Sequence, residues 1–530
     1  MPTASSLTAP ATRRRRLTFR RLAAWLVSRA TRPETAYWLV VTFALVHGLL
    51  WTKILIELKA AQDVHMDVAE AFAWGQKFQL GYGKHPPLSG WVAGAWFYFF
   101  PAQDWATYAL AMTTLGVGLV ICWFIAIRVV DYRRAFFVVV MLALYPIFNF
   151  KGFKYNPDLL QLVTLPLVVL AYLNAFERRT WLSGVWLGLA GALALMTKYW
   201  VLTMIGAIGL AALIHPDRLK FLRSPAPWVA VATLVVAMIP HLIWLKQVDF
   251  VPLTYASDVY GLSSRAQSAQ LVLGYIGHNL ALLALPVALA ALALAWPPRW
   301  LGRAWSRRPN MGVNVSQARN IWWTQAIVAI GPPLGALAFM VYMKTDWGIS
   351  LFFLVPLALV AIPSLRIPAG ALFRITAIWL VLSLATLAAA PRIAVWEMER
   401  NSNSVASYGA RSQLARELTQ LWHQQFGSRW AVVAGTTEIG EPMTFYSPDH
   451  PAPFTPGEIW SSGLTSLEEA KRLGFIGICD TTDWRLSECE KWMKENAPDA
   501  QEQIITTQRF FRGHPGPSTA WKVYIQPPAK

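Results

Sequence analysis

Charged residues are scarce in this chain. They make up 14% of its 530 residues, whereas hydrophobic residues make up 55%. A typical soluble domain has about 25% charged residues. Several apolar runs reach about 18 residues or more, which is long enough to cross a bilayer as a helix. The composition therefore excludes an ordinary soluble protein and predicts a polytopic membrane protein.

The motifs of nucleotide-dependent and metal-dependent enzymes are also lacking. The sequence has no Walker loop, no GxGxxG, no HExxH and no CxxC. We therefore expect no cofactor and no metal ligands. The net charge is +18, but the cytoplasmic loops of membrane proteins collect Lys and Arg. This explanation of the positive charge requires no nucleic-acid partner.

Cysteine is rare, with three residues in the whole chain. Cys122 lies within an apolar run and is interpreted as a packing residue. Cys479 and Cys489 are ten positions apart near the C-terminus. If that region faces an oxidising compartment, a disulfide between them is plausible, although spacing alone does not bring two side chains together.

The apolar runs divide the chain into three parts. Residues 1–34 carry the basic run Arg13–Arg16 and no cleavage site for a signal peptidase, so they are interpreted as a cytoplasmic tail with an amphipathic helix at Leu17–Val27. Residues 35–390 are predicted to form an all-α polytopic membrane bundle of about 11–13 spans. The predicted spans are Thr35–Ile56, Trp105–Val130, Ala135–Phe150, Leu159–Phe176, Trp181–Met196, Tyr199–Ile214, Pro227–Leu245, Ala269–Trp296, Ile321–Met343, Gly348–Pro363 and Ala371–Ala390.

The charges in the loops indicate an orientation. If the N-terminus is cytoplasmic, Arg-rich loops alternate with loops that mix acids and Lys, as the positive-inside rule requires. The inner loops hold Arg128, Arg133, Arg134, Arg178, Arg179, Arg218, Lys220, Arg223, Arg299, Arg303, Arg307, Arg308 and Arg366. The first outer loop is residues 57–104, in which Leu88–Phe100 is predicted to be an interfacial helix or a half-span. An odd number of spans places the C-terminus outside.

Residues 391–530 have the composition of a small soluble α/β domain. Helices are predicted at Ser404–Phe426, Ser466–Leu473 and Ser487–Asn496. Strands are predicted at Arg429–Ala434, Phe475–Cys479, Gln503–Phe510 and Trp521–Ile525. The predicted localisation is the bacterial inner membrane, with this domain in the periplasm.

Two acids in the first outer loop are candidates for chemistry. Asp67 begins the helical stretch MDVAEAFAWGQKF, and Glu70 lies one turn later. A carboxylate in a half-buried cleft can accept a proton from an incoming hydroxyl. An N-cap role for Asp67 is equally consistent with the sequence, and Glu70 also fits a solvated helix face.

The stretch Gly83-Lys84-His85-Pro86-Pro87 follows the two acids. Its prolines stiffen the backbone and fix the directions of Lys84 and His85. A cation held near a carboxylate would stabilise the negative charge of a departing phosphate. An interfacial histidine with no role in chemistry remains the alternative for His85.

Further ionisable residues lie at span ends on the same predicted face. Lys198 separates two apolar runs and either snorkels to the interface or faces a cavity. Asp158 opens a span, where it also favours the helix dipole. Lys154 precedes it, and Lys344 with Asp346 either binds substrate or forms a rim salt bridge. The set as a whole favours an anionic, phosphate-linked substrate whose lipid tail stays in the membrane.

Three short motifs resemble one family. They are Asp67 in MDVAEAF with His85-Pro86-Pro87-Leu88 in GKHPPLSGW, then Met196-Thr197-Lys198, then Phe445-Tyr446-Ser447-Pro448-Asp449. Their order resembles that in the membrane-embedded C-type glycosyltransferases. These include the protein O-mannosyltransferases and the bacterial transferases that add aminoarabinose or galacturonic acid to lipid A. Val68 departs from the Asp-Glu pair of the mannosyltransferases.

The resemblance implies a transferase that moves a sugar from a polyprenyl-phosphate donor to an envelope acceptor on the periplasmic face, with inversion and without a metal. The acceptor would be lipid A, lipopolysaccharide core or another glycan or lipid. The resemblance assigns the catalytic role to Asp67 and donor phosphate binding to Lys198 and to Lys84 or His85. Apart from the resemblance, the residues on the same predicted face that are candidates for contact with substrate are Glu70, Lys154, Asp158 and Lys344. A polytopic transporter or an envelope assembly scaffold is the alternative.

Overall fold

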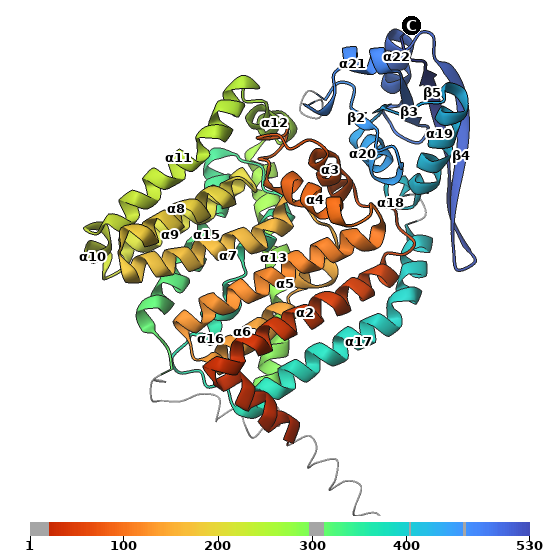
Figure 1. Ribbon diagram of the computed structural model, residues 1–530. Coiled ribbons are helices and arrows are strands. Elements are labelled where there is room, and N and C mark those ends of the chain that lie inside the picture. The colour runs from red at the N-terminus through yellow and green to blue at the C-terminus, as the bar shows by residue number, and fades with distance from the viewer. Residues whose placement is uncertain (1–20, 296–311, 402–403, 459–462, 530) are drawn as a thin grey trace, which may run out of the picture.

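The computed structural model describes residues 21–295, 312–401, 404–458 and 463–529. A bundle of helices forms the larger part, and a small domain with a β-sheet sits on one end of it (Figure 1). The basic run Arg13–Arg16 and the loop arginines between 299 and 308 lie outside the described residues, as does the start of the helix predicted at Leu17–Val27.

Seven helices in the described residues are long and apolar enough to cross a membrane, or eight spans if a bent helix pair counts as one. The predicted all-α polytopic bundle is therefore confirmed. The seven are α2 (Pro33–Leu58), α5 (Asp104–Val129), α7 (Pro157–Arg178), α11 (Pro225–Gln247), α13 (Arg265–Ala295), α15 (Val315–Phe339) and α17 (Ala369–Arg400).

Shorter elements explain why the sequence predicted more spans. The helices α8 (Trp181–Leu195) and α9 (Leu202–Ile214) are apolar but have fewer than 18 residues. The span predicted at Gly348–Pro363 is wrong. This segment contains the end of the 3-10 helix η5 (Thr345–Leu351) and the six-residue helix α16 (Val355–Val360). Apolar composition alone did not distinguish a buried irregular segment from a crossing helix.

The span predicted at Ala135–Phe150 is a bent pair. Helix α6 (Tyr132–Ala143) ends before Pro146, and the chain turns by 78° into η1 (Pro146–Phe148) and η2 (Phe150–Phe153). Proline cannot donate the backbone hydrogen bond that would continue a helix, so the break falls there. The remaining short helices of the bundle are α3 (Met66–Gly75), α4 (Leu88–Phe99), η3 (Tyr199–Val201), α10 (Arg218–Leu222) and α12 (Val251–Val259).

The C-terminal domain contains a five-stranded mixed sheet with the order β2-β1-β3-β5-β4. Strand β1 is parallel to β2 and β3, and β5 is antiparallel to β3 and β4. The strands are β1 (Val432–Ala434), β2 (Ala452–Phe454), β3 (Phe475–Asp480), β4 (Gln501–Phe511) and β5 (His514–Gln526). The helices are α18 (Val405–Tyr408), α19 (Arg411–Phe426), α20 (Thr437–Tyr446), α21 (Leu467–Leu473) and α22 (Leu486–Asn496).

This domain was predicted as α/β, but several boundaries were wrong. The boundary at 390/391 falls inside α17, because the helix continues in polar sequence to Arg400. The helix predicted at Ser404–Phe426 is broken at Ala410, which has a φ of 54°. Helix α20 and strand β2 were not predicted. Both are short, and Pro442 lies inside α20, which argues against a helix in sequence reasoning.

Two hydrophobic clusters lie on the two sides of the sheet. One contains Trp422 and Trp430 with Ile476, and the other contains Tyr524 with Met493. The second cluster includes Cys479, which forms the predicted disulfide with Cys489. Cys122 is buried and free, as expected for a packing residue.

Arg128 and the sheet domain lie at opposite ends of helix α5. Helix α5 begins at Asp104, whose carboxylate accepts a hydrogen bond from Tyr446 in the C-terminal domain. The same helix ends beside Arg128, which pairs with Glu177 at the far end of α7 at 2.9 Å. At this helix, the predicted separation of Arg from the mixed ionisable residues is present.

Helices α3 and α4 pack with their backbones nearly in contact, which requires glycine. A Cβ atom on Gly94 would lie 2.5 Å from the carbonyl oxygen of Gly75. We expect Gly94→Ala to destabilise the protein by about 1–3 kcal/mol, because the two helices must separate. Gly206→Ala on α9 is the matched control, since a Cβ there meets nothing within 4 Å. Thermal unfolding of the purified protein in detergent should show a lower midpoint for the first variant only; equal midpoints would contradict this packing argument.

Candidate active site

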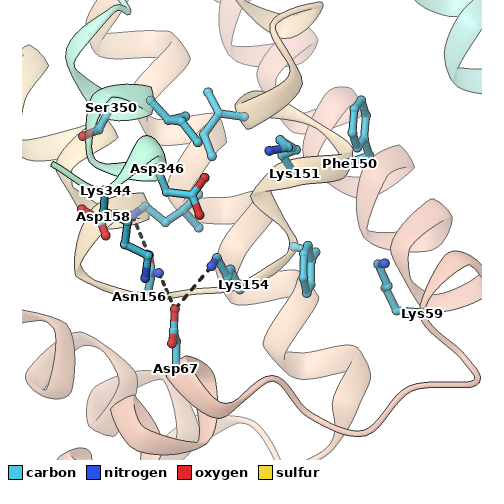
Figure 2. A pocket seen from close by; sticks show the side chains of 14 residues that line it. Lys59, Asp67, Phe150, Lys151, Lys154, Asn156, Asp158, Lys344, Asp346 and Ser350 are labelled. Carbon is cyan, nitrogen blue, oxygen red and sulfur yellow. Dashed lines mark hydrogen bonds and ion pairs between the residues drawn. The ribbon is translucent and has the colours of Figure 1, made fainter. Parts of the chain in front are cut away.

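Asp67 lies in the first turn of α3 and points toward the start of α7. The N-cap of α3 is His65, whose ring nitrogen accepts a hydrogen bond from the Asp67 backbone N–H at 3.1 Å. The N-cap alternative for Asp67 is therefore wrong. Its Oδ2 accepts a hydrogen bond from Asn156 Nδ2 at 2.8 Å and lies 3.6 Å from Lys154 Nζ. Figure 2 shows these two side chains converging on the carboxylate.

The charge state of Asp67 follows from these neighbours. Burial alone would raise the pKa of its carboxyl group. Interactions with His65 and Lys154, the hydrogen bond from Asn156 and the more distant Lys344 outweigh burial and lower this pKa below its usual range. Asp67 is therefore ionised at neutral pH, and its carboxylate can accept a hydrogen bond from a bound hydroxyl group and orient it. It becomes a stronger proton acceptor if a bound anion draws Lys154 away.

A polar cavity of about 310 Å³ opens beside Asp67. Lysine and aspartate side chains from four segments line it, and Figure 2 shows Lys59 and Ser350 at opposite ends of the group. The polar lining residues are Lys59, Asp67, Lys151, Lys154, Asn156, Asp158, Lys344, Asp346 and Ser350. The cavity therefore suits a polar, charged group.

Lys198 and Asp158 form an ion pair between this cavity and a second one. Lys198 Nζ lies 2.7 and 2.9 Å from the two carboxylate oxygens of Asp158. Lys198 is only 7% exposed and lies 5.2 Å from the Trp347 ring centre. It faces a cavity, so the snorkelling alternative is wrong. Asp158 lies in the first turn of α7, where it also favours the helix dipole.

The second cavity is larger, about 650 Å³, and mostly apolar. Its walls come from the loop after α3 and from the segments around η3, α12 and η5. Its lining residues are Lys84, His85, Lys198, Tyr199, Trp200, Leu202, Thr203, Pro252, Tyr255, Tyr260, Gly261, Leu262, Met340, Val341, Tyr342 and Trp347. A few polar groups therefore adjoin a long hydrophobic and aromatic surface.

Lys84 is held by Glu70. Its Nζ lies 2.7 Å from Glu70 Oε1, and both side chains are about nine-tenths buried. Burial favours the neutral amine, but the Glu70 carboxylate raises the pKa of Lys84 above its usual value, so the ammonium stays charged. The alternative that Glu70 lies on a solvated helix face is therefore wrong. Burial and the nearby Lys198 ammonium lower the pKa of His85 well below its ordinary value, so this ring is neutral.

A carboxyl group that sequence reasoning missed lies near this pair. Glu441 on α20 is 3% exposed, and its Oε2 has no hydrogen-bond partner among the described residues. Burial and then the Glu70 charge raise the pKa of Glu441 well above its usual value. The C-terminal domain therefore contributes a buried carboxyl group to the surroundings of Lys84.

The structure thus brings the predicted site residues together at one end of the bundle. Lys344 lines the polar cavity, and Asp346 pairs with His278 at 3.5 Å, so Lys344 and Asp346 do not form the alternative rim salt bridge.

Asn156 was missed, although Asn-Pro-Asp before an apolar run is an N-terminal helix signature. Among the described residues, no group of three or more His, Cys, Asp or Glu side chains is arranged to hold a metal ion.

Comparison with known proteins identifies relatives. Residues 84–244 match the model of the dolichyl-phosphate-mannose-protein mannosyltransferase family. The chain is 24% identical over 216 residues to the lipid A galacturonosyltransferase RgtD of Rhizobium johnstonii. That match covers 40% of this chain and 44% of the relative, less than half of either protein.

A solved structure covers more of the chain. The crystal structure of ArnT from Cupriavidus metallidurans bound to undecaprenyl phosphate aligns with 91% of this chain and 97% of that one, at 12% identity and a TM-score of 0.57. This chain has the C-type glycosyltransferase fold. The resemblance predicted from its motifs is confirmed, and its relatives are glycosyltransferases by name.

The Lys84–Glu70 pair predicts a pH-dependent stability. Lys84→Met should destabilise the protein by about 3–5 kcal/mol at neutral pH, because it leaves a buried carboxylate unpaired. Burial then acts unopposed and raises the pKa of Glu70 further above its unfolded value. A carboxyl group whose pKa is higher in the folded state than in the unfolded state stabilises the folded protein at acid pH. This contribution to the free energy of unfolding is lost as the pH rises through the folded-state pKa. Thermal unfolding should therefore show a deficit that grows from acid to neutral pH.

The double variant Lys84→Met/Glu70→Gln is the control for this prediction. It removes both charges, so it should recover most of the lost stability and lose the pH dependence of the deficit. A deficit in Lys84→Met that is independent of pH would contradict the assignment of Glu70 as its buried partner.

Proposed function

We propose that this protein transfers a sugar from a polyprenyl-phosphate donor to an anionic envelope acceptor, such as lipid A, lipopolysaccharide core or another glycan or lipid. One observation carries the proposal. Lys198, which with Lys84 lines an apolar cavity, forms an ion pair with Asp158, which lines a polar cavity beside Asp67. A lipid-linked donor could bind in the apolar cavity and a polar acceptor in the polar one.

The donor would lie in the larger cavity. Its hydrocarbon would pack on the aromatic and aliphatic walls, and its phosphate would lie near Lys198 and Lys84. Charge-assisted hydrogen bonds from these ammonium groups would stabilise the phosphate as it departs. Neutral His85 can donate or accept one hydrogen bond there but supplies no charge. The ArnT relative, bound to undecaprenyl phosphate, supports a donor of this class.

The acceptor would lie in the smaller cavity. Its lysines favour a negatively charged head group, and such a group would draw Lys154 toward itself. Asp67, with fewer positive neighbours, would then accept the hydroxyl proton more readily. Glu70 and Asp158 would act through Lys84 and Lys198, which they position.

The proposed step forms one bond and breaks another. The acceptor oxygen bonds to the anomeric carbon, the bond from that carbon to the phosphate oxygen breaks, and the proton of the acceptor hydroxyl passes to Asp67. If the acceptor group is a phosphate, no proton needs removal and Asp67 only positions it. Attack from the polar cavity while phosphate leaves into the other inverts the anomeric centre. Phosphate is already an activated leaving group, so the proposal includes no cofactor and no metal.

We propose further that the site faces the periplasm from the bacterial inner membrane. The end of the bundle away from the site carries Arg128, Arg134 and Arg178, and the positive-inside rule favours the cytoplasm for that end. The site and the C-terminal domain lie at the other end.

The test of the proposed reaction is Asp67→Asn. Purified protein in lipid nanodiscs is incubated with radiolabelled polyprenyl-phosphate sugars and envelope glycolipids, and transfer is measured by mass spectrometry and scintillation counting. We expect the variant to lose about 100-fold or more in kcat, the scale of general-base catalysis. Asp249→Asn is the control, because it removes an exposed acid that lines neither cavity. Full turnover by the Asp67 variant would remove Asp67 from catalysis.

A second prediction concerns the acceptor. Lys151 lines the polar cavity but not the apolar one. We expect Lys151→Met to raise KM for an anionic acceptor about tenfold, the equivalent of losing one ionic hydrogen bond, and to leave KM for the donor unchanged. Steady-state kinetics with each substrate varied in turn measures both values. A rise in donor KM alone would contradict the assignment of the two cavities.

A further inference from the structure

The seven residues 59–65 join α2 to α3, and their backbone is bonded to the C-terminal domain. The Asp63 N–H donates to the Ser407 carbonyl at 2.7 Å, and the Val64 N–H donates to the Tyr446 hydroxyl at 2.6 Å. Arg509 donates to the Gln62 carbonyl at 3.0 Å. Three consecutive residues just before α3 are thus held by one domain that lies more than 340 positions away in the sequence.

The Asp63 side chain fixes the same segment from two sides. Its carboxylate is fully buried, accepts a hydrogen bond from the Arg411 backbone N–H at 3.1 Å, and forms ion pairs with both Arg411 and Arg509. Arg411 also donates to the Val64 carbonyl at 3.2 Å. A buried carboxylate between two arginines is held far more rigidly than an exposed pair, because moving it leaves buried charge unpaired.

Tyr446 joins this segment to the membrane bundle. Its hydroxyl accepts the hydrogen bond from Val64 and donates its own proton to Asp104 Oδ1 at 2.8 Å. Asp104 is the first residue of the spanning helix α5. One hydroxyl therefore fixes the entry to α3 relative to a spanning helix. Phe445, the residue before Tyr446, packs against Phe72 of α3 with ring centres 5.3 Å apart.

Asp67 lies four residues after Asp63, in the first turn of α3. The direction in which a short helix leaves its preceding segment fixes where its first-turn side chains point. A displacement of about 1 Å at a reacting group can cost 100-fold in rate. The bonds from the C-terminal domain therefore act where they control the position of Asp67.

We propose that the C-terminal domain is a positioning element of the active site, and that Asp63, Arg411, Arg509 and Tyr446 hold the 59–65 segment so that Asp67 meets the acceptor. None of these four residues lines either of the two cavities. They are positioning residues that act through Asp67, and the domain is a working part of the catalytic centre. This inference rests on the proposed glycosyl transfer.

The test compares two Tyr→Phe variants in the C-terminal domain. Tyr446→Phe removes the hydroxyl between Val64 and Asp104. We expect kcat to fall about tenfold or more, with KM for the donor and the thermal shift caused by undecaprenyl phosphate unchanged, because the donor cavity is untouched. Tyr524→Phe is the matched control, since Tyr524 packs in the cluster on the other side of the sheet and bonds to no residue of the 59–65 segment. It should retain kcat.

A second variant checks the arginine contacts. Asp63→Asn keeps the shape of the side chain and removes its charge, so it should lower kcat with the donor KM unchanged, as Tyr446→Phe does. If the wild-type protein transfers no sugar, the proposed function fails. If the wild type is active and Tyr446→Phe retains its kcat, or if both tyrosine variants lose kcat equally, the positioning role is wrong. If Asp63→Asn is too unstable to purify, the Tyr446 comparison still decides the question.

Discussion

Each of three cations at the site is paired with a carboxylate from a different segment of the chain. Lys84 pairs with Glu70, Lys198 with Asp158, and Lys154 with Asp67. Charges at the edge of a membrane are costly to bury unless they are paired. The pairing requirement therefore draws the loop after α3, the start of α7 and the segment after α8 to one place.

Pairing also sets what each group can do. Asp67 is ionised because positive groups surround it, and Lys84 stays charged because Glu70 adjoins it. These pairs leave the site close to neutral without substrate. A bound anion would replace Asp67 as the partner of Lys154, and Asp67 would keep its hydrogen bond from Asn156. The same exchange would change the basicity of Asp67 only when an acceptor is present, which links proton transfer to acceptor binding.

The C-terminal domain is attached at the point where this arrangement is most sensitive. Its contacts with the bundle include hydrogen bonds to Gln62, Asp63 and Val64, directly before α3, and a buried carboxyl group, Glu441, near Lys84. A soluble domain that only bound acceptor would not need buried ion pairs with the membrane part. The residues that hold the domain in place therefore bear on the chemistry of the site.

The sequence predicted the membrane bundle, the α/β domain, the disulfide and the gathering of Asp67 with Lys198 on one face. These features depend on local patterns: apolar length, charge asymmetry, cysteine spacing and short motifs. It missed Asn156 and Glu441 as neighbours of the site, because their roles depend on segments far apart in the chain. It took Gly348–Pro363 for a span, because a buried irregular segment and a crossing helix have the same apolar composition. The sequence also did not predict the ion pairs that Asp63 forms with Arg411 and Arg509. No local pattern identifies a charged residue as the partner of another that lies about 350 to 450 positions away.

The most direct test of the central claim is a cryo-electron microscopy structure of the protein in nanodiscs with bound undecaprenyl phosphate. Our account predicts that the lipid fills the cavity of about 650 Å³, with its phosphate within hydrogen-bonding distance of Lys198 and on the opposite side of the Lys198–Asp158 pair from Asp67. A phosphate in the cavity of about 310 Å³, or a lipid bound between other helices with both cavities empty, would contradict it.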